Sequence, residues 1–115
     1  MRPEYLVIAV AVFFVASMLM NRAGRTSSED ARRLVEAGAR LVDVRTQGEF
    51  SQGHLPGALN LPVSDLSGLE GELDGDKAKP VVLYCRSGSR SGRAKRFLQK
   101  QGFSEVHDLG PMSAW

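Results

Sequence analysis

The stretch "VVLYCRSGSR", residues 81–90, constrains the fold of this 115-residue chain more than any other part of its sequence. It begins with an apolar run rich in valine, which predicts a buried parallel strand that ends at Cys85. A loop of arginine, serine and glycine follows, after which Ala94, Phe97 and Leu98 recur at helical spacing. A strand that turns directly into a helix indicates an α/β fold.

The rest of the sequence repeats this alternation of strands and helices. A capping box, "TSSE", predicts a helix over residues 26–38, and "RLVDV" predicts a second buried strand at 40–44. A short strand is expected around 58–61, a weak helix interrupted by glycine at 63–73, and a last strand at 104–109. We therefore expect a three-layer α/β domain whose small, mostly parallel central sheet is flanked by helices.

Residues 1–22 form a hydrophobic segment that is set apart from this domain. The run from Tyr5 to Met20 has sixteen residues without a charge, and as a helix it would be roughly 24 Å long, somewhat short of the ~30 Å core of a bilayer. Because no A-x-A-like cleavage site follows, a retained membrane anchor is favoured over a signal peptide. The expected organisation is this segment, a linker at 23–26 and a single globular domain at 27–115.

The placement of basic residues predicts the side of the membrane on which the domain lies. Arg2 precedes the apolar run, whereas Arg22, Arg25, Arg32 and Arg33 follow it. The positive-inside rule then favours a single-pass protein with a cytoplasmic domain. The alternative is export to the periplasm after cleavage of the segment as a signal peptide.

The composition argues against several classes of site. Cys85 is the only cysteine, which rules out an intramolecular disulfide. Because His54 and His107 are the only histidines, a metal site is not expected, and no cofactor is expected either. The net charge of +2 is too small to indicate nucleic-acid binding. The basic helix "RSGRAKRFLQK", residues 90–100, is interpreted as a solvated surface, with anionic lipid a better partner for it than nucleic acid.

The surroundings of the single cysteine favour a reactive thiol over a buried structural one, which is the alternative. Parallel strands end at the edge of the sheet where ligands bind, so the thiol is expected at that edge. Small residues after it let backbone N–H groups turn inward at a helix N-terminus, and two arginines add positive charge. Such surroundings lower the pKa of a thiol, which predicts a nucleophile with an anionic substrate. The predicted site is Cys85 with Arg86, Ser87, Gly88, Ser89 and Arg90.

Two blocks of the sequence resemble the single-domain rhodanese family. They are "LVDVRTQGEFSQGHLPGALNLP" and "VVLYCRSGSRSGRAKRFLQKQGFSEVHDLGPMSAW", and the resemblance covers roughly Thr26 to Trp115. It implies a sulfurtransferase in which Cys85 takes the outer sulfur of a small anionic donor, such as thiosulfate, and carries it as a persulfide. The sulfur would then pass to cyanide, a thiol or a protein acceptor. Backbone amides of the loop would cradle the sulfur, while Arg86 and Arg90 would hold the donor.

The first block carries residues for which positioning roles are expected. Asp43 and Arg45 could reach the active-site edge or form an ion pair that ties loops together. The structural role is favoured more strongly for Asp43, and Arg45 is also predicted to bind the donor. The resemblance implies that the other motif residues shape the loop between the strands. These are Glu49, His54, Pro56 and Gly57.

Two other functions compete with independent sulfurtransferase activity. A phosphatase or arsenate reductase on the same fold needs five residues between the cysteine and an arginine that clamps the oxyanion. Ser91 stands at that position and Arg90 comes one residue early, so the loop is sized for sulfur rather than phosphate. The other alternative is a membrane-tethered module that binds or relays sulfur to a partner without turnover of its own.

Overall fold

The computed structural model describes the backbone of residues 2–73 and 75–115, and the side chains of these residues except 16–23. The described residues form a four-stranded sheet in the order β2-β1-β3-β4, in which every pairing is parallel. The strands are β1 (Arg40–Asp43), β2 (Leu59–Asn60), β3 (Val81–Cys85) and β4 (Val106–Pro111). Because parallel strands end at the same edge, the loops that follow β1 and β3 meet there.

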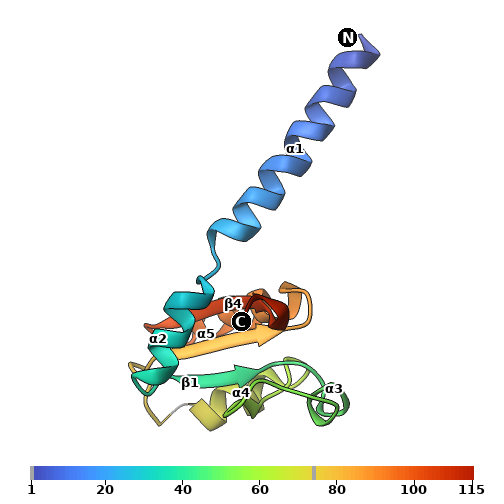
Figure 1. Ribbon diagram of the computed structural model, residues 1–115. Coiled ribbons are helices and arrows are strands. Elements are labelled where there is room, and N and C mark those ends of the chain that lie inside the picture. The colour runs from blue at the N-terminus through green and yellow to red at the C-terminus, as the bar shows by residue number, and fades with distance from the viewer. Residues whose placement is uncertain (1, 74) are drawn as a thin grey trace.

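Helices cover both faces of the sheet (Figure 1). On one face, Leu69 and Leu73 pack with Ala94 and Leu98 in one buried cluster. On the other face, Ala31 packs in a second cluster. The helices of the domain are α2 (Ser28–Glu36), α3 (Gln47–Ser51), α4 (Leu66–Leu73), α5 (Ser89–Lys100) and the short 3-10 helix η1 (Met112–Ala114).

Strand β3 lies between β1 and β4, and its side chains fill both layers of the core. Val81, Leu83 and Cys85 belong to the cluster with α4 and α5, whereas Val82 and Tyr84 belong to the cluster with α2. All five side chains are fully buried. Burial on both faces explains why this strand is a continuous apolar run in the sequence. The expected α/β fold, with a small parallel sheet flanked by helices, is confirmed.

The start of α2 differs from the expected capping box. Ser27, not Thr26, is the N-cap residue, and its hydroxyl accepts a hydrogen bond from the backbone N–H of Asp30 at 3.2 Å. The N–H of Thr26 instead donates to the carbonyl of Asp108 at 2.7 Å. Because that bond ties the linker to β4, the helix begins one residue later than the sequence pattern predicts.

Helix α1 (Pro3–Ala23) extends away from the domain (Figure 1), and its described apolar side chains are exposed. In the part of the chain that the structure describes, no helix has the length and apolar character needed to cross a membrane. The prediction of a single-pass membrane protein is therefore wrong, and the expected membrane partner is not supported. Physically, the uncharged run of roughly 24 Å is shorter than the ~30 Å hydrocarbon core. The end of that run, residues 16–20, lies outside the described side chains.

Candidate active site

Cys85 is the last residue of β3, and the loop that follows encloses its fully buried thiol. The backbone N–H of Gly88 donates to Sγ at 2.9 Å, and that of Ser91 lies 3.4 Å from it. Gly88 is the N-cap of α5 and has a φ of 97°, in the left-handed region that favours glycine. This conformation folds the loop back over the sulfur, so α5 begins at Ser89 rather than near Ser91.

The surroundings of the thiol stabilise its anionic form. Burial, the largest single influence, raises the pKa of Cys85. Hydrogen bonds from the Ser91 side chain and from the backbone of Ser91, Gly88 and Ser87 lower this pKa, and together they outweigh burial. The pKa of the thiol is therefore lowered from its ordinary value, as expected for a cysteine at a helix N-terminus.

Ser91 is a residue of the site that the sequence prediction left without a role. Its side chain is fully buried, with Oγ 3.5 Å from the sulfur of Cys85, and its hydroxyl donates to the carbonyl of Gly88 at 3.2 Å. Because a hydroxyl rotates freely, the same group can donate to the sulfur once the thiol has lost its proton. The signal in the sequence is a small hydroxyl residue in the first turn of a helix that starts at a reactive loop.

The predicted loop residues Arg86, Ser87 and Ser89 are exposed. Within the described part of the chain, the side chain of Arg86 makes no hydrogen bond or ion pair. None of the described carboxylates therefore pairs with the charge of this exposed loop residue.

The structure pairs Arg90 with Glu49. The Arg90 guanidinium donates to both carboxylate oxygens, at 2.6 and 2.9 Å, and Glu49 also completes a capping box with Thr46 at the start of α3. The hydrogen bond from Arg90, the largest influence, lowers the pKa of Glu49 to about 2. The same bond raises the pKa of Arg90. Both predicted site residues thus meet in one contact that links α3 to α5.

Asp43 and Arg45 adopt the ion-pair arrangement that was one of the two expected alternatives. The Arg45 guanidinium donates to both oxygens of Asp43 at distances from 2.7 to 3.1 Å, and to the carbonyl of Gly53 at 2.7 Å. Asp43 is fully buried and Arg45 is 6% exposed. The hydrogen bond to Asp43 is the largest influence on Arg45 and raises its pKa. The pair fixes the end of β1 against the loop that follows α3.

That loop holds His54, Pro56 and Gly57. The imidazole Nδ1 of His54 lies 2.9 Å from the carbonyl oxygen of Leu55, and Gly57 has a φ of 81°. Sequence reasoning gave no role to Tyr84, yet its buried hydroxyl accepts a hydrogen bond from the N–H of Leu55 at 3.0 Å. A tyrosine inside a buried strand is itself a signal, because its hydroxyl needs a partner.

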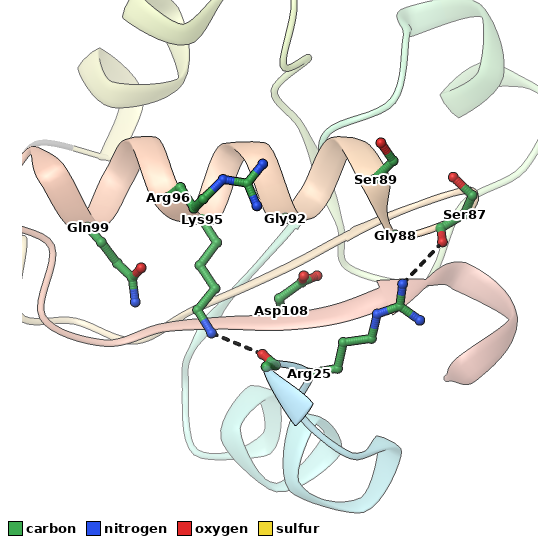
Figure 2. A pocket seen from close by; sticks show the side chains of 10 residues that line it. Arg25, Ser87, Gly88, Ser89, Gly92, Lys95, Arg96, Gln99 and Asp108 are labelled. Atoms are coloured by element: carbon green, nitrogen blue, oxygen red, sulfur yellow. Dashed lines mark hydrogen bonds between the residues drawn. The ribbon is translucent and has the colours of Figure 1, made fainter. Parts of the chain in front are cut away.

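A cavity of about 460 Å³ lies beside the loop that follows Cys85, between α5, β4 and the linker (Figure 2). The loop residues 87–89 form part of its wall, and Arg25, Lys95 and Arg96 bring positive charge to it, with Asp108 as a carboxylate. We call this space the cationic cavity. Among the residues that the structure describes, no group of three or more His, Cys, Asp or Glu side chains could hold a metal ion.

The comparison with known families decides the identity of this fold. Residues 27–115 match the rhodanese-like domain. The chain belongs to the rhodanese-like domain family. The predicted family is therefore confirmed, without the membrane anchor that was expected to accompany it.

Individual relatives of this rhodanese-like protein carry sulfurtransferase names. The thiosulfate sulfurtransferase GlpE of Shewanella oneidensis is 40% identical over 76 residues, which cover 65% of this chain and 73% of that protein. Uncharacterized protein YqhL of Bacillus subtilis is 38% identical over 109 residues, covering 93% and 85%. The solved structure of human single domain sulfurtransferase TSTD1 is 27% identical with a TM-score of 0.65, covering 80% and 91%. GlpE and TSTD1, the two relatives with sulfurtransferase names, support sulfur transfer as the general activity.

Proposed function

We propose that this rhodanese-like protein moves a sulfane sulfur from an anionic donor, such as thiosulfate, to a thiol or cyanide through a persulfide on Cys85. One observation carries the proposal. The sulfur is buried at the end of β3, and its described partners are the N–H groups of Gly88 and Ser91 and the hydroxyl of Ser91. All of them can donate to an anion, so the site is built to hold negative charge on sulfur.

The chemistry divides into two transfers. In the first, the Cys85 thiolate attacks the outer sulfur of thiosulfate; a new S–S bond forms, the S–S bond of thiosulfate breaks, and sulfite leaves with the electron pair. In the second, the thiolate of the acceptor, or cyanide, attacks the outer sulfur of the persulfide. The persulfide S–S bond then breaks and the electron pair returns to Sγ of Cys85. The lowered pKa increases the fraction of thiolate, and we therefore assign no separate general base.

The arginines have different parts in this proposal. We assign donor binding to Arg86, because its guanidinium is exposed beside the loop and lacks a carboxylate partner among the described residues. Arg45 and Arg90 already pair with Asp43 and Glu49, so we give them the role of holding the loops in place. Because the loop is positively charged, we expect it to bind thiosulfate, a compact dianion, better than a mercaptocarboxylate.

The geometry disfavours the phosphatase alternative. A phosphatase loop needs an arginine six residues after the cysteine, to clamp the phosphoryl oxygens. The structure has the buried side chain of Ser91 there, directed at Sγ rather than at a substrate outside the loop. Release of phosphate from an aryl phosphate, abolished by Cys85→Ser, would nevertheless replace the present proposal.

The test is the intact mass of the protein after incubation with thiosulfate. We expect the mass to increase by one sulfur atom, the increase to disappear on treatment with cyanide or a small thiol, and Cys85→Ser to show no increase. Arg86→Gln should retain the persulfide at saturating donor but raise the thiosulfate KM, whereas Arg93→Gln, which removes an exposed cation from α5, should not raise it. A protein that stays unmodified by thiosulfate and by 3-mercaptopyruvate would contradict the proposal.

A steady-state assay with cyanide or a small thiol, added to the mass measurement, separates an enzyme from a relay module. A relay module would gain the sulfur atom once but would show no steady-state turnover with cyanide or a small thiol. Turnover with either acceptor supports the enzyme, and loading without turnover supports the relay. A clear preference for 3-mercaptopyruvate over thiosulfate would contradict the choice of donor.

A further inference from the structure

Arg25 lies outside residues 27–115 that match the family, yet its side chain reaches the catalytic loop (Figure 2). Its Nη2 donates to the carbonyl of Ser87, with a distance of 3.4 Å between nitrogen and oxygen. The bond between the N–H of Thr26 and the carbonyl of Asp108 fixes the adjacent backbone on β4. The linker therefore delivers this guanidinium to a defined position against the loop.

The Arg25 side chain packs against the backbone of two glycines, Gly88 and Gly110. A Cβ at Gly88 would lie 2.3 Å from Nη2 of Arg25, and a Cβ at Gly110 would lie 2.9 Å from its Cδ and Nε. Both glycines have positive φ angles, 97° and 86°. The Arg25 side chain thus lies across the backbone at both positions, where any side chain would displace it.

The carbonyl that Arg25 contacts is chemically connected to the catalytic sulfur. The C=O of Ser87 and the N–H of Gly88 belong to one peptide unit, which is planar and trans, so the two groups point in opposite directions. Arg25 holds the oxygen end on the outside of the loop. The nitrogen end donates to Sγ of Cys85 at 2.9 Å, the shortest hydrogen bond to the sulfur among the described contacts.

We propose that Arg25 is a positioning residue for the sulfur of Cys85, which acts through the Ser87–Gly88 peptide. By holding the Ser87 carbonyl outward, it aims the Gly88 N–H at the sulfur. As a charged donor it also polarises the peptide, which strengthens the hydrogen bond at the other end. This inference rests on the proposed role of Cys85 as nucleophile, and it places a determinant of that role in the linker before the family domain.

The test is the pH dependence of alkylation of Cys85 by iodoacetamide, which is unambiguous because the chain has one cysteine. We expect Arg25→Gln to raise the pKa seen in the rate profile and to slow alkylation at neutral pH by about three- to tenfold. Above the pKa of both proteins, the two rates should converge. Arg25→Lys keeps the charge but not the planar fork across the two glycines, so it should restore the rate only in part.

The matched control is Arg96→Gln, which removes a positive charge from the same cationic cavity without a contact to Ser87. Its alkylation profile should stay within about twofold of wild type, since screened surface charges act weakly. The amide proton of Gly88 gives a second readout by NMR: it should move upfield in Arg25→Gln, and by less in Arg25→Lys. Both readouts need a folded protein, which thermal unfolding checks.

Two results would overturn the inference. One is an Arg25→Gln profile identical to wild type, with the Gly88 amide unmoved. The other is an equal effect of Arg96→Gln, which would assign the pKa to cavity charge rather than to the peptide. Neither result bears on persulfide formation, because alkylation needs no sulfur donor. Conversely, failure of the protein to gain sulfur from thiosulfate would leave the alkylation profiles unaffected.

Discussion

The Glu49 carboxylate accepts hydrogen bonds from the Arg90 guanidinium with both oxygens and so joins α3 to α5, although the two residues are 41 positions apart in the sequence. The side chains are 27% and 33% exposed, which leaves the pair only partly screened by water. Arg90 ends the six-residue segment that begins at Cys85, and Gly88 and Ser91 hold the sulfur from within. The ion pair therefore ties the end of this segment to α3.

Replacing Glu49 with Gln should remove the charge of this pair while keeping an acceptor for the capping box with Thr46. The pKa of Glu49 is lowered in the folded protein from 4.5 to about 2. A lowered pKa contributes stability above the unfolded value, and this contribution is lost as the pH falls from about 5 toward 2. We expect Glu49→Gln to reduce the free energy of unfolding by about 1 kcal/mol at pH 7 and to flatten its pH dependence in that window.

Urea unfolding at several pH values measures this effect. The control is Glu29→Gln on α2, whose ion pair with Arg33 is exposed, with side chains 75% and 68% accessible. We expect that variant to change the free energy of unfolding by a few tenths of a kcal/mol at most. An equal loss in the two variants would mean that the pair with Arg90 contributes no more to the free energy of unfolding than an exposed ion pair does.

Replacing Ser91 with Ala should raise the pKa of the Cys85 thiol. The hydroxyl is one of the groups that lower this pKa, and the backbone N–H of the same residue stays in place. A raised pKa means less thiolate at neutral pH, so alkylation and persulfide formation should slow by about three- to tenfold and recover at higher pH. Stopped-flow alkylation against pH is the measurement, with the exposed Ser104→Ala as control. A uniform loss of rate at every pH would contradict this explanation.

Local sequence patterns were enough to predict the strand that carries Cys85, the helix after it and the loop between them, whose N–H groups face the sulfur. These features depend on neighbours along the chain: an apolar run, a glycine that can adopt positive φ, and helical spacing. The family resemblance added the fold as a whole. The three-layer arrangement follows because β3 is apolar on both faces.

Tertiary partners were not predictable in the same way. Arg90 was expected to face the donor, because the loop alone gives no sign that Glu49 takes its guanidinium. The direction of the Ser91 side chain depends on where α5 begins, and its start at Ser89 is set by the conformation of Gly88. Likewise, the cap of α2 moved to Ser27 because the preceding N–H bonds to β4. In each case a contact with another helix, strand or loop determines a side-chain direction or a helix start that the neighbouring residues in the sequence leave open.

Replacing Gly88 with Ala should destabilise the loop. An L-residue at a φ of 97° is strained, and the new Cβ would lie 2.3 Å from Arg25. We expect a loss of about 1–3 kcal/mol in the free energy of unfolding, together with a raised thiol pKa. The control, Gly71→Ala in α4, has no positive φ and no atom within 4 Å of the new Cβ. That substitution should stabilise the protein by about 0.5–1 kcal/mol, because alanine favours a helix.

Breaking the Asp43–Arg45 pair should have the largest effect on stability. Asp43→Asn would leave the guanidinium of Arg45 buried without its counter-charge, which typically costs about 3–5 kcal/mol. We expect a reduced free energy of unfolding in urea, whereas Arg33→Gln on the surface of α2 should change it little. A loss below about 1 kcal/mol would show that water reaches this pair and compensates for the missing charge.

Replacing Tyr84 with Phe should lower the stability of the protein without changing the reactivity of the Cys85 thiol. Burial, first, and a hydrogen bond with Asp43 raise the pKa of Tyr84 to about 12, so its hydroxyl is neutral and accepts the N–H of Leu55. Phe fills the same volume but leaves that N–H without its partner, and we expect a loss of about 1–3 kcal/mol in the free energy of unfolding.

The alkylation profile of Cys85 should be unchanged in this variant. Tyr84 and Cys85 are consecutive residues of β3, so their side chains lie on opposite faces of the sheet, in separate core clusters. The exposed Tyr5→Phe on α1 is the control for both measurements and should alter neither. If Tyr84→Phe shifted the pH profile of the thiol, then the loop held by Leu55 would itself contribute to the cradle, and the sulfur site would extend across the sheet edge to the segment before β2.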